Sequence, residues 1–63
     1  MKGGLTMTCI IEIPLSQVNL VIAIAKKYHV LVDTLYEDDL YSHLELIGTR
    51  KNIEKTIKEI HKI

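Results

Sequence analysis

The clearest candidate for chemistry in this sequence is His43, which lies between Tyr41 and Glu45 in an alternating segment. Alternation in an extended chain places these three side chains on one face of a strand. A neutral imidazole binds transition metals, and it takes up a proton at about pH 6.5. His43 is therefore a candidate metal ligand or titrating switch. The competing interpretation is a polar residue on a sheet face that meets solvent or a second subunit.

An acidic run, Glu37-Asp38-Asp39, follows the strand expected at 30–36. Clustered carboxylates hold hard cations through oxygen, but no calcium-loop spacing follows this run. The tip of a hairpin is also an ordinary place for charges that favour solubility. Both interpretations of the run remain open.

A basic segment, Thr49-Arg50-Lys51, precedes the last helical stretch. Two cations beside the free N–H groups of a helix start can hold a phosphate. The segment matches neither a Walker nor a Rossmann motif, so simple solvation of both charges is the alternative. A nucleic-acid site would need Lys26 and Lys27 on the same surface. We do not expect one, because single-strand binding needs several stacking aromatics and the open sheet face offers only Tyr41.

The single cysteine, Cys9, alternates with Ile11 and Ile13 and is expected in the core. One cysteine excludes an intrachain disulfide, and a lone free thiol favours a reducing, cytoplasmic location. No nucleophile motif, paired cysteines or glycine-rich turn is present. His43 and Glu45, two apart on one strand face, form a candidate acid–base pair, but such a pair is also a common accident. We therefore expect a protein that is not an enzyme.

The composition predicts one small domain that associates with other chains. The 63 residues include eight basic and eight acidic ones, and 48% are hydrophobic. A neutral chain exerts no overall attraction on nucleic acid or anionic lipid. The longest apolar run, 20–25, is far shorter than the roughly 20 residues that span a membrane. A domain this small is marginal alone, and its apolar content indicates a partner surface.

Hydrophobic periodicity predicts strand, helix, strand, strand, helix. Residues 1–63 form one domain, with 1–6 a loose N-terminal end. Ser16 is the expected N-cap of the first helix, which carries an apolar arc wide enough to be buried on two sides. Thr49 or Asn52 caps the second helix. The predicted segments are strands at 7–13, 30–36 and 40–47, and helices at 15–29 and 52–63.

This order is α+β: the ferredoxin-like βαββα pattern with its final strand missing. We expect an antiparallel sheet, covered on one face by two helices, with the third strand between the first and second. The first strand is then an unpaired edge. Edge-to-edge pairing of two first strands or face-to-face stacking of two sheets would cover it, giving a homodimer or tetramer.

The stretches Tyr28-His-Val-Leu-Val-Asp-Thr-Leu-Tyr and Ser42-His-Leu-Glu-Leu-Ile-Gly resemble ACT- and RAM-type regulatory domains. Within that superfamily the chain is most similar to the regulatory domain of nickel-responsive repressors of the NikR kind. The family's metal-ligand positions fall here on Tyr36, Asp38, His43 and near Lys26, so the nickel set is not retained. Asp38 and His43, with His29 nearby in sequence, remain candidates for a divalent transition metal.

The resemblance to ACT domains also implies an effector site at Pro14, Leu15 and Ser16, although the glycine common there is absent. It implies a non-catalytic regulatory or ligand-sensing module that oligomerises, with the ligand at a subunit interface. Two alternatives remain. The first is a metal-binding domain in which His43 and Asp38 of two chains converge. The second is a structural or protein-interaction module, or a weak nucleic-acid binder.

Overall fold

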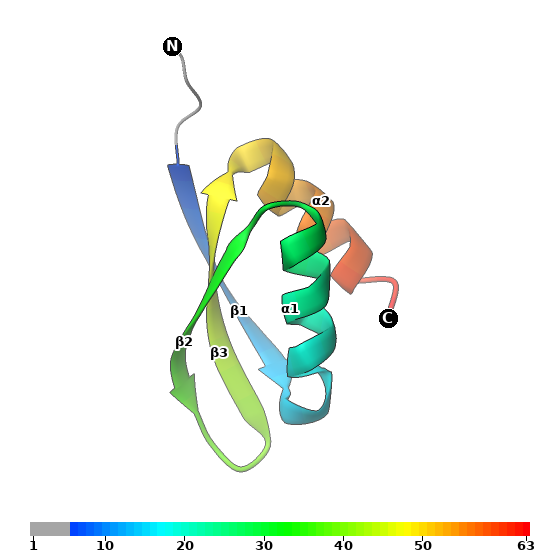
Figure 1. Ribbon diagram of the computed structural model, residues 1–63. Helices are drawn as coiled ribbons and strands as arrows, with labels where there is room; N and C mark the ends of the chain where they lie inside the picture. The colour runs from blue at the N-terminus through cyan, green and yellow to red at the C-terminus, as the bar shows by residue number, and fades with distance from the viewer. Residues whose placement is uncertain (1–5) are drawn as a thin grey trace.

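The computed structural model describes residues 6–63 and confirms the α+β, ferredoxin-like order of elements (Figure 1). A three-stranded sheet forms one layer, and two helices pack on one of its faces. A short 3-10 turn leads into the first helix. The elements are β1 (Thr6–Pro14), η1 (Leu15–Gln17), α1 (Val18–Lys27), β2 (Leu31–Glu37), β3 (Tyr41–Thr49) and α2 (Arg50–Ile60).

The sheet is antiparallel with strand order β1-β3-β2, so the predicted central position of the third strand is confirmed. Pairing of β1 with β3 runs without interruption from Thr6 opposite Thr49 to Pro14 opposite Tyr41. Pairing of β2 with β3 shifts between Thr34 and Tyr36, where a β-bulge interrupts the ladder. The sheet therefore has two outer strands, one regular and one bulged.

The core lies between the sheet and the two helices. Leu44 and Leu46 of β3 are fully buried, and Val21 of α1 is also fully buried. Ile53 of α2 is 5% exposed and packs in the same cluster as Leu46. Cys9 packs against that cluster as a small apolar side chain, as its alternation predicts.

A histidine in the left-handed region ends the first helix. His29 has φ 59°, and its N–H donates to the carbonyl of Lys26 at 3.2 Å. The N–H of Val30 donates to the carbonyl of Ala25 at 2.8 Å. These two bonds form a Schellman motif, in which glycine is the usual left-handed residue.

Several predicted boundaries and roles are wrong. β1 begins at Thr6, so residue 6 is not part of a loose end; residues 1–5 lie outside the described residues. Ser16 does not cap α1, because Leu15–Gln17 form a 3-10 turn and Gln17 occupies the N-cap without a side-chain bond. Leu40, the first residue of the strand predicted at 40–47, lies in the hairpin turn with 70% of its surface exposed, and the first buried residue of β3 is Ser42. Thr49 does cap α2: its Oγ1 accepts from the N–H of Asn52.

Candidate functional site

The two outer strands differ in how well they are protected against pairing with another chain. β2 carries the bulge after Thr34 together with Asp33 and Glu37, all of which discourage a new strand. β1 pairs regularly over nine residues, and Glu12 is its only charged residue. The free edge of β1 is thus long, regular and almost uncharged.

A groove of about 290 Å³ lies between this edge and α2. Its floor comes from the helix-side residues of β1, and its wall comes from the last turns of α2. In a complete ferredoxin-like unit a further strand follows the second helix and pairs with the first strand. We call this hollow the edge groove; it is lined by Ile11, Glu12, Ile13, Ile57, Ile60 and His61.

Antiparallel pairing of β1 with a second copy of itself would bring no like charges together. Ile10 is the midpoint of the strand Thr6–Pro14, so antiparallel pairing about this residue places Ile10 against Ile10 of the second copy. Glu12 then lies opposite Thr8, and no two like charges meet. Ile10 is 62% exposed in the isolated chain, and pairing would cover part of that surface.

His43 lies on the uncovered face of the sheet, as predicted. Its Nε2 is 3.3 Å from Oε2 of Glu12, the residue paired with it on β1. On its other side the ring of Tyr36 lies 5.5 Å from the imidazole, tilted by 60°. The His43 side chain is 35% exposed. It is held between a carboxylate and an aromatic ring, and it remains reachable from solvent.

The three predicted metal ligands do not converge within one chain. His29 precedes β2 and Asp38 follows it, so the seven-residue strand separates them by roughly 20 Å. Asp38 instead forms the hairpin turn, where its Oδ1 accepts the N–H groups of Leu40 and Tyr41 at 2.9 and 2.8 Å. Those bonds, the one from Tyr41 foremost, lower the pKa of Asp38. Among residues 6–63 no three His, Cys, Asp or Glu side chains are grouped to hold a metal ion.

The predicted effector segment connects β1 to α1. Pro14 ends the strand, and Leu15 and Ser16 lie exposed in the 3-10 turn. The N–H of Leu15 donates to the carbonyl of Leu40 at 3.0 Å, which ties this turn to the β2–β3 hairpin. The edge groove does not include these residues, so an effector site here stays a prediction.

The predicted anion site lies at the first turn of α2. Thr49 Oγ1 accepts the N–H of Asn52 at 3.2 Å, so this cap already satisfies one of the free N–H groups. Arg50 Nε lies 3.2 Å from Oε2 of Glu54, and both side chains are more than 60% exposed. Lys51 is also exposed and lines a hollow of about 430 Å³ on the outer side of α2. The segment can meet an anion from solvent, and this use of it also stays a prediction.

A contact that sequence patterns did not predict joins the two helices. Glu59 of α2 accepts a hydrogen bond from the Tyr28 hydroxyl at 2.6 Å and one from Lys27 Nζ at 3.1 Å. The bond from Tyr28, followed by that from Lys27, lowers the pKa of Glu59. The bond to Glu59 raises the pKa of Tyr28 and that of Lys27. Residues more than 30 positions apart come together here only through the fold, so no local spacing reveals them.

No protein-family model matches the chain, and no curated protein matches it. The resemblance to ACT-type and nickel-repressor domains therefore remains a prediction. Neither helix within residues 6–63 has the length and apolar character needed to cross a membrane.

Proposed function

We propose that this chain is a non-catalytic regulatory module that acts as a homodimer, formed by pairing of β1 with β1 of a second copy. The observation that supports the proposal is the contrast between the two sheet edges. β2 carries a bulge and acidic residues, whereas β1 is regular and lies beside an apolar groove. An unprotected edge of this kind is a template for another strand.

The same edge gives a small ligand a place at the subunit interface. The edge groove combines isoleucine side chains with two polar ones, Glu12 and His61. Ligand sites have this character, with an apolar lining and a few polar groups that orient the bound molecule. A ligand that contacts both chains there binds the dimer better than the monomer, and it shifts the association equilibrium by that difference.

The test is light scattering coupled to size exclusion. It compares two variants that each replace an exposed aliphatic residue by lysine, one on each edge of the sheet. Ile10→Lys places two lysines against each other at the proposed axis and should give a monomer. Leu31→Lys changes a residue of similar exposure on β2, 68% against 62%, and should keep the dimer. A monomeric native chain, or two variants with the same mass, would overturn the proposal.

A metal-binding function is the second candidate, favoured by the Glu12–His43 pair. One chain supplies two donors 3.3 Å apart on an uncovered face, and stacking two such faces would bring four donors together. Asp38 lies near the same end of the sheet, because it forms the hairpin turn that leads directly into β3. Calorimetry with nickel or zinc should show uptake that His43→Ala abolishes and His29→Ala leaves intact. Absence of uptake at millimolar metal would exclude this candidate without affecting the dimer.

A further inference from the structure

The overall neutrality of the chain hides a separation of charge between its two layers. No lysine or arginine occurs in the three strands or in the hairpin loop. The strands and hairpin loop hold six of the eight acidic residues: Glu12, Asp33, Glu37, Asp38, Asp39 and Glu45. The helices and the turn after α2 hold seven of the eight basic residues: Lys26, Lys27, Arg50, Lys51, Lys55, Lys58 and Lys62.

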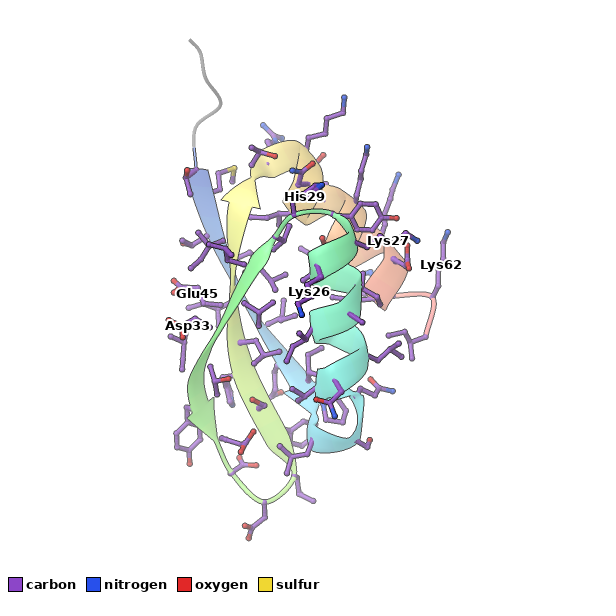
Figure 2. The ribbon with its side chains drawn as sticks, viewed as in Figure 1. Lys26, Lys27, His29, Asp33, Glu45 and Lys62 are labelled. Carbon is purple, nitrogen blue, oxygen red and sulfur yellow. The ribbon has the colours of Figure 1, made fainter. Side chains whose placement is uncertain are left out.

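The two layers present these charges on opposite sides of the molecule. Figure 2 shows Asp33 and Glu45 close together on the side of the sheet away from the helices. Lys27 and Lys62 project from the helical side in the same view. The molecule is therefore a charge dipole with a basic helical layer, and an anionic partner meets attraction from one side only.

Three lysines of α2 and one in the turn that follows it form a row, which we call the lysine ridge: Lys51, Lys55, Lys58 and Lys62. The spacing of Lys51, Lys55 and Lys58 repeats the helical period, so these three share one face of α2, and Lys62 follows in the turn at the same four-residue spacing. All four are exposed, while Ile53 and Thr56 of the same helix are buried against the core. The helical part of the ridge, from Lys51 to Lys58, extends over about 10 Å at 1.5 Å per residue.

The two acidic residues of α2 form their ion pairs with cations outside the ridge, although Glu54 lines the same hollow as three of the ridge lysines. Glu54 pairs with Arg50 at 3.2 Å, and Glu59 pairs with Lys27 at 3.1 Å. None of the ion pairs formed within residues 6–63 includes a ridge lysine.

We propose that the lysine ridge binds the phosphate backbone of a nucleic-acid duplex without reading its sequence. A duplex carries one negative charge per about 1.7 Å of its axis, and lysines at a protein surface bind it by displacing counterions. Contacts to phosphate alone position a protein but carry no sequence information. The phosphates repel the acidic sheet, so the charge dipole orients the protein with its helical layer towards the duplex.

Other anionic partners fit this surface less well. An interfacial helix needs an apolar face for the bilayer, and that face of α2 is already buried in the core. Single strands need exposed aromatic platforms, but Tyr36 and Tyr41 belong to the sheet and the Tyr28 hydroxyl is bonded to Glu59. Stacking of the acidic sheet of another copy on the ridge would be a heterologous, head-to-tail contact. Such a contact does not form a closed ring, and its repetition would build fibres.

The ridge does not depend on the proposed dimer, but the dimer would strengthen it. Antiparallel pairing of two β1 strands has its two-fold axis perpendicular to the sheet, so the helices of both copies lie on the same side. Two ridges on one face bind a long polyanion with avidity. Loss of the dimer by Ile10→Lys should weaken duplex binding without abolishing it, whereas loss of the ridge should leave the dimer intact.

The test is fluorescence anisotropy with a short labelled duplex of mixed sequence. The native chain should bind, and its affinity should fall with salt at a logarithmic slope of about −3 to −4 per chain, the value for about four phosphate contacts. The double variant Lys55→Gln/Lys58→Gln should reduce that slope by about 2 and weaken binding at least about tenfold at low salt. The control Leu31→Glu/Leu35→Glu makes the same change in net charge on β2 and should weaken binding much less.

Four results would overturn the proposal. The first is no binding at low salt, and the second is equal loss of binding in the ridge variant and the control. The third is tighter binding to single strands or to phosphatidylserine vesicles than to the duplex. The fourth is an increase of the mass measured by light scattering at low salt in the absence of nucleic acid, if the ridge variant suppresses that increase. This result would show that the ridge binds other copies of the chain.

Discussion

Asp33 and Glu45 lie directly opposite each other across β2 and β3, on the uncovered face of the sheet. Like charges in this position destabilise a sheet. Asp33→Asn should therefore raise the free energy of unfolding by roughly 0.2–1 kcal/mol at low salt. Urea denaturation measures the change, and repeating it at about 1 M salt should remove most of the gain, because screening weakens the repulsion. An equal gain at both salt concentrations would show that the repulsion is not its cause.

Acid should unfold the protein through two carboxylates in particular. Hydrogen bonds lower the pKa of Glu59 and that of Asp38 in the folded chain. A lowered folded pKa gives stability that is fully present above the unfolded pKa, about 4 for both groups, and is lost as pH falls through the folded value. Glu59→Gln should lower stability at neutral pH and flatten its dependence on pH below about 5. Urea titrations from pH 7 to 3 provide the check, with exposed Glu54→Gln as the control that should retain the native slope.

Ser42 is a buried hydroxyl with no hydrogen-bond partner within residues 6–63, although its side chain is fully inaccessible. Burying an unpaired hydroxyl costs roughly 1–3 kcal/mol. Ser42→Ala keeps the volume nearly constant and should raise the free energy of unfolding by about 1 kcal/mol. Ser16→Ala, on the exposed turn, should change it little. Destabilisation by Ser42→Ala in thermal or urea unfolding would show that the hydroxyl has a partner.

His29 holds a left-handed conformation at the end of α1. A non-glycine residue there carries a cost of roughly 1 kcal/mol, which glycine avoids. His29→Gly should therefore stabilise the fold by about 0.5–1 kcal/mol, while His29→Val should destabilise it because a β-branched residue tolerates this region poorly. Both changes are measurable by thermal unfolding, and a destabilising glycine would indicate a contact of the imidazole that outweighs the strain.

The sequence predicted the elements whose signals are local. Alternation in β3 placed His43 on the uncovered face, and Thr49, one of the two residues expected to cap α2, does cap it. The predicted start of the third strand at Leu40 is wrong, because the turn formed by Asp38 includes Leu40 and β3 begins only at Tyr41. Ser16 failed as a cap because a 3-10 turn precedes α1.

Contacts and charge patterns that depend on the tertiary fold could not be predicted from the sequence. The contacts of Glu59 with Lys27 and Tyr28 join residues that only the packing of two helices brings together. The charge separation was not predicted, because the net charge is a sum over the whole chain. A binding partner instead interacts with the charges of the one face that it contacts. The three metal candidates looked close in sequence, but β2 extends between His29 and Asp38. Extended chain separates neighbours by about 3.3 Å per residue.

The central claim is that β1 pairs with β1 of a second copy, and site-directed crosslinking tests it most directly. In the background Cys9→Ser, the variant Ile10→Cys should form a covalent dimer under mild oxidation, because residues directly opposite in an antiparallel pair lie about 4.5–5.5 Å apart at Cα, within disulfide range. Leu31→Cys on β2 should remain monomeric on a non-reducing gel. Efficient crosslinking through Leu31→Cys but not through Ile10→Cys would contradict the account and assign the interface to the other edge.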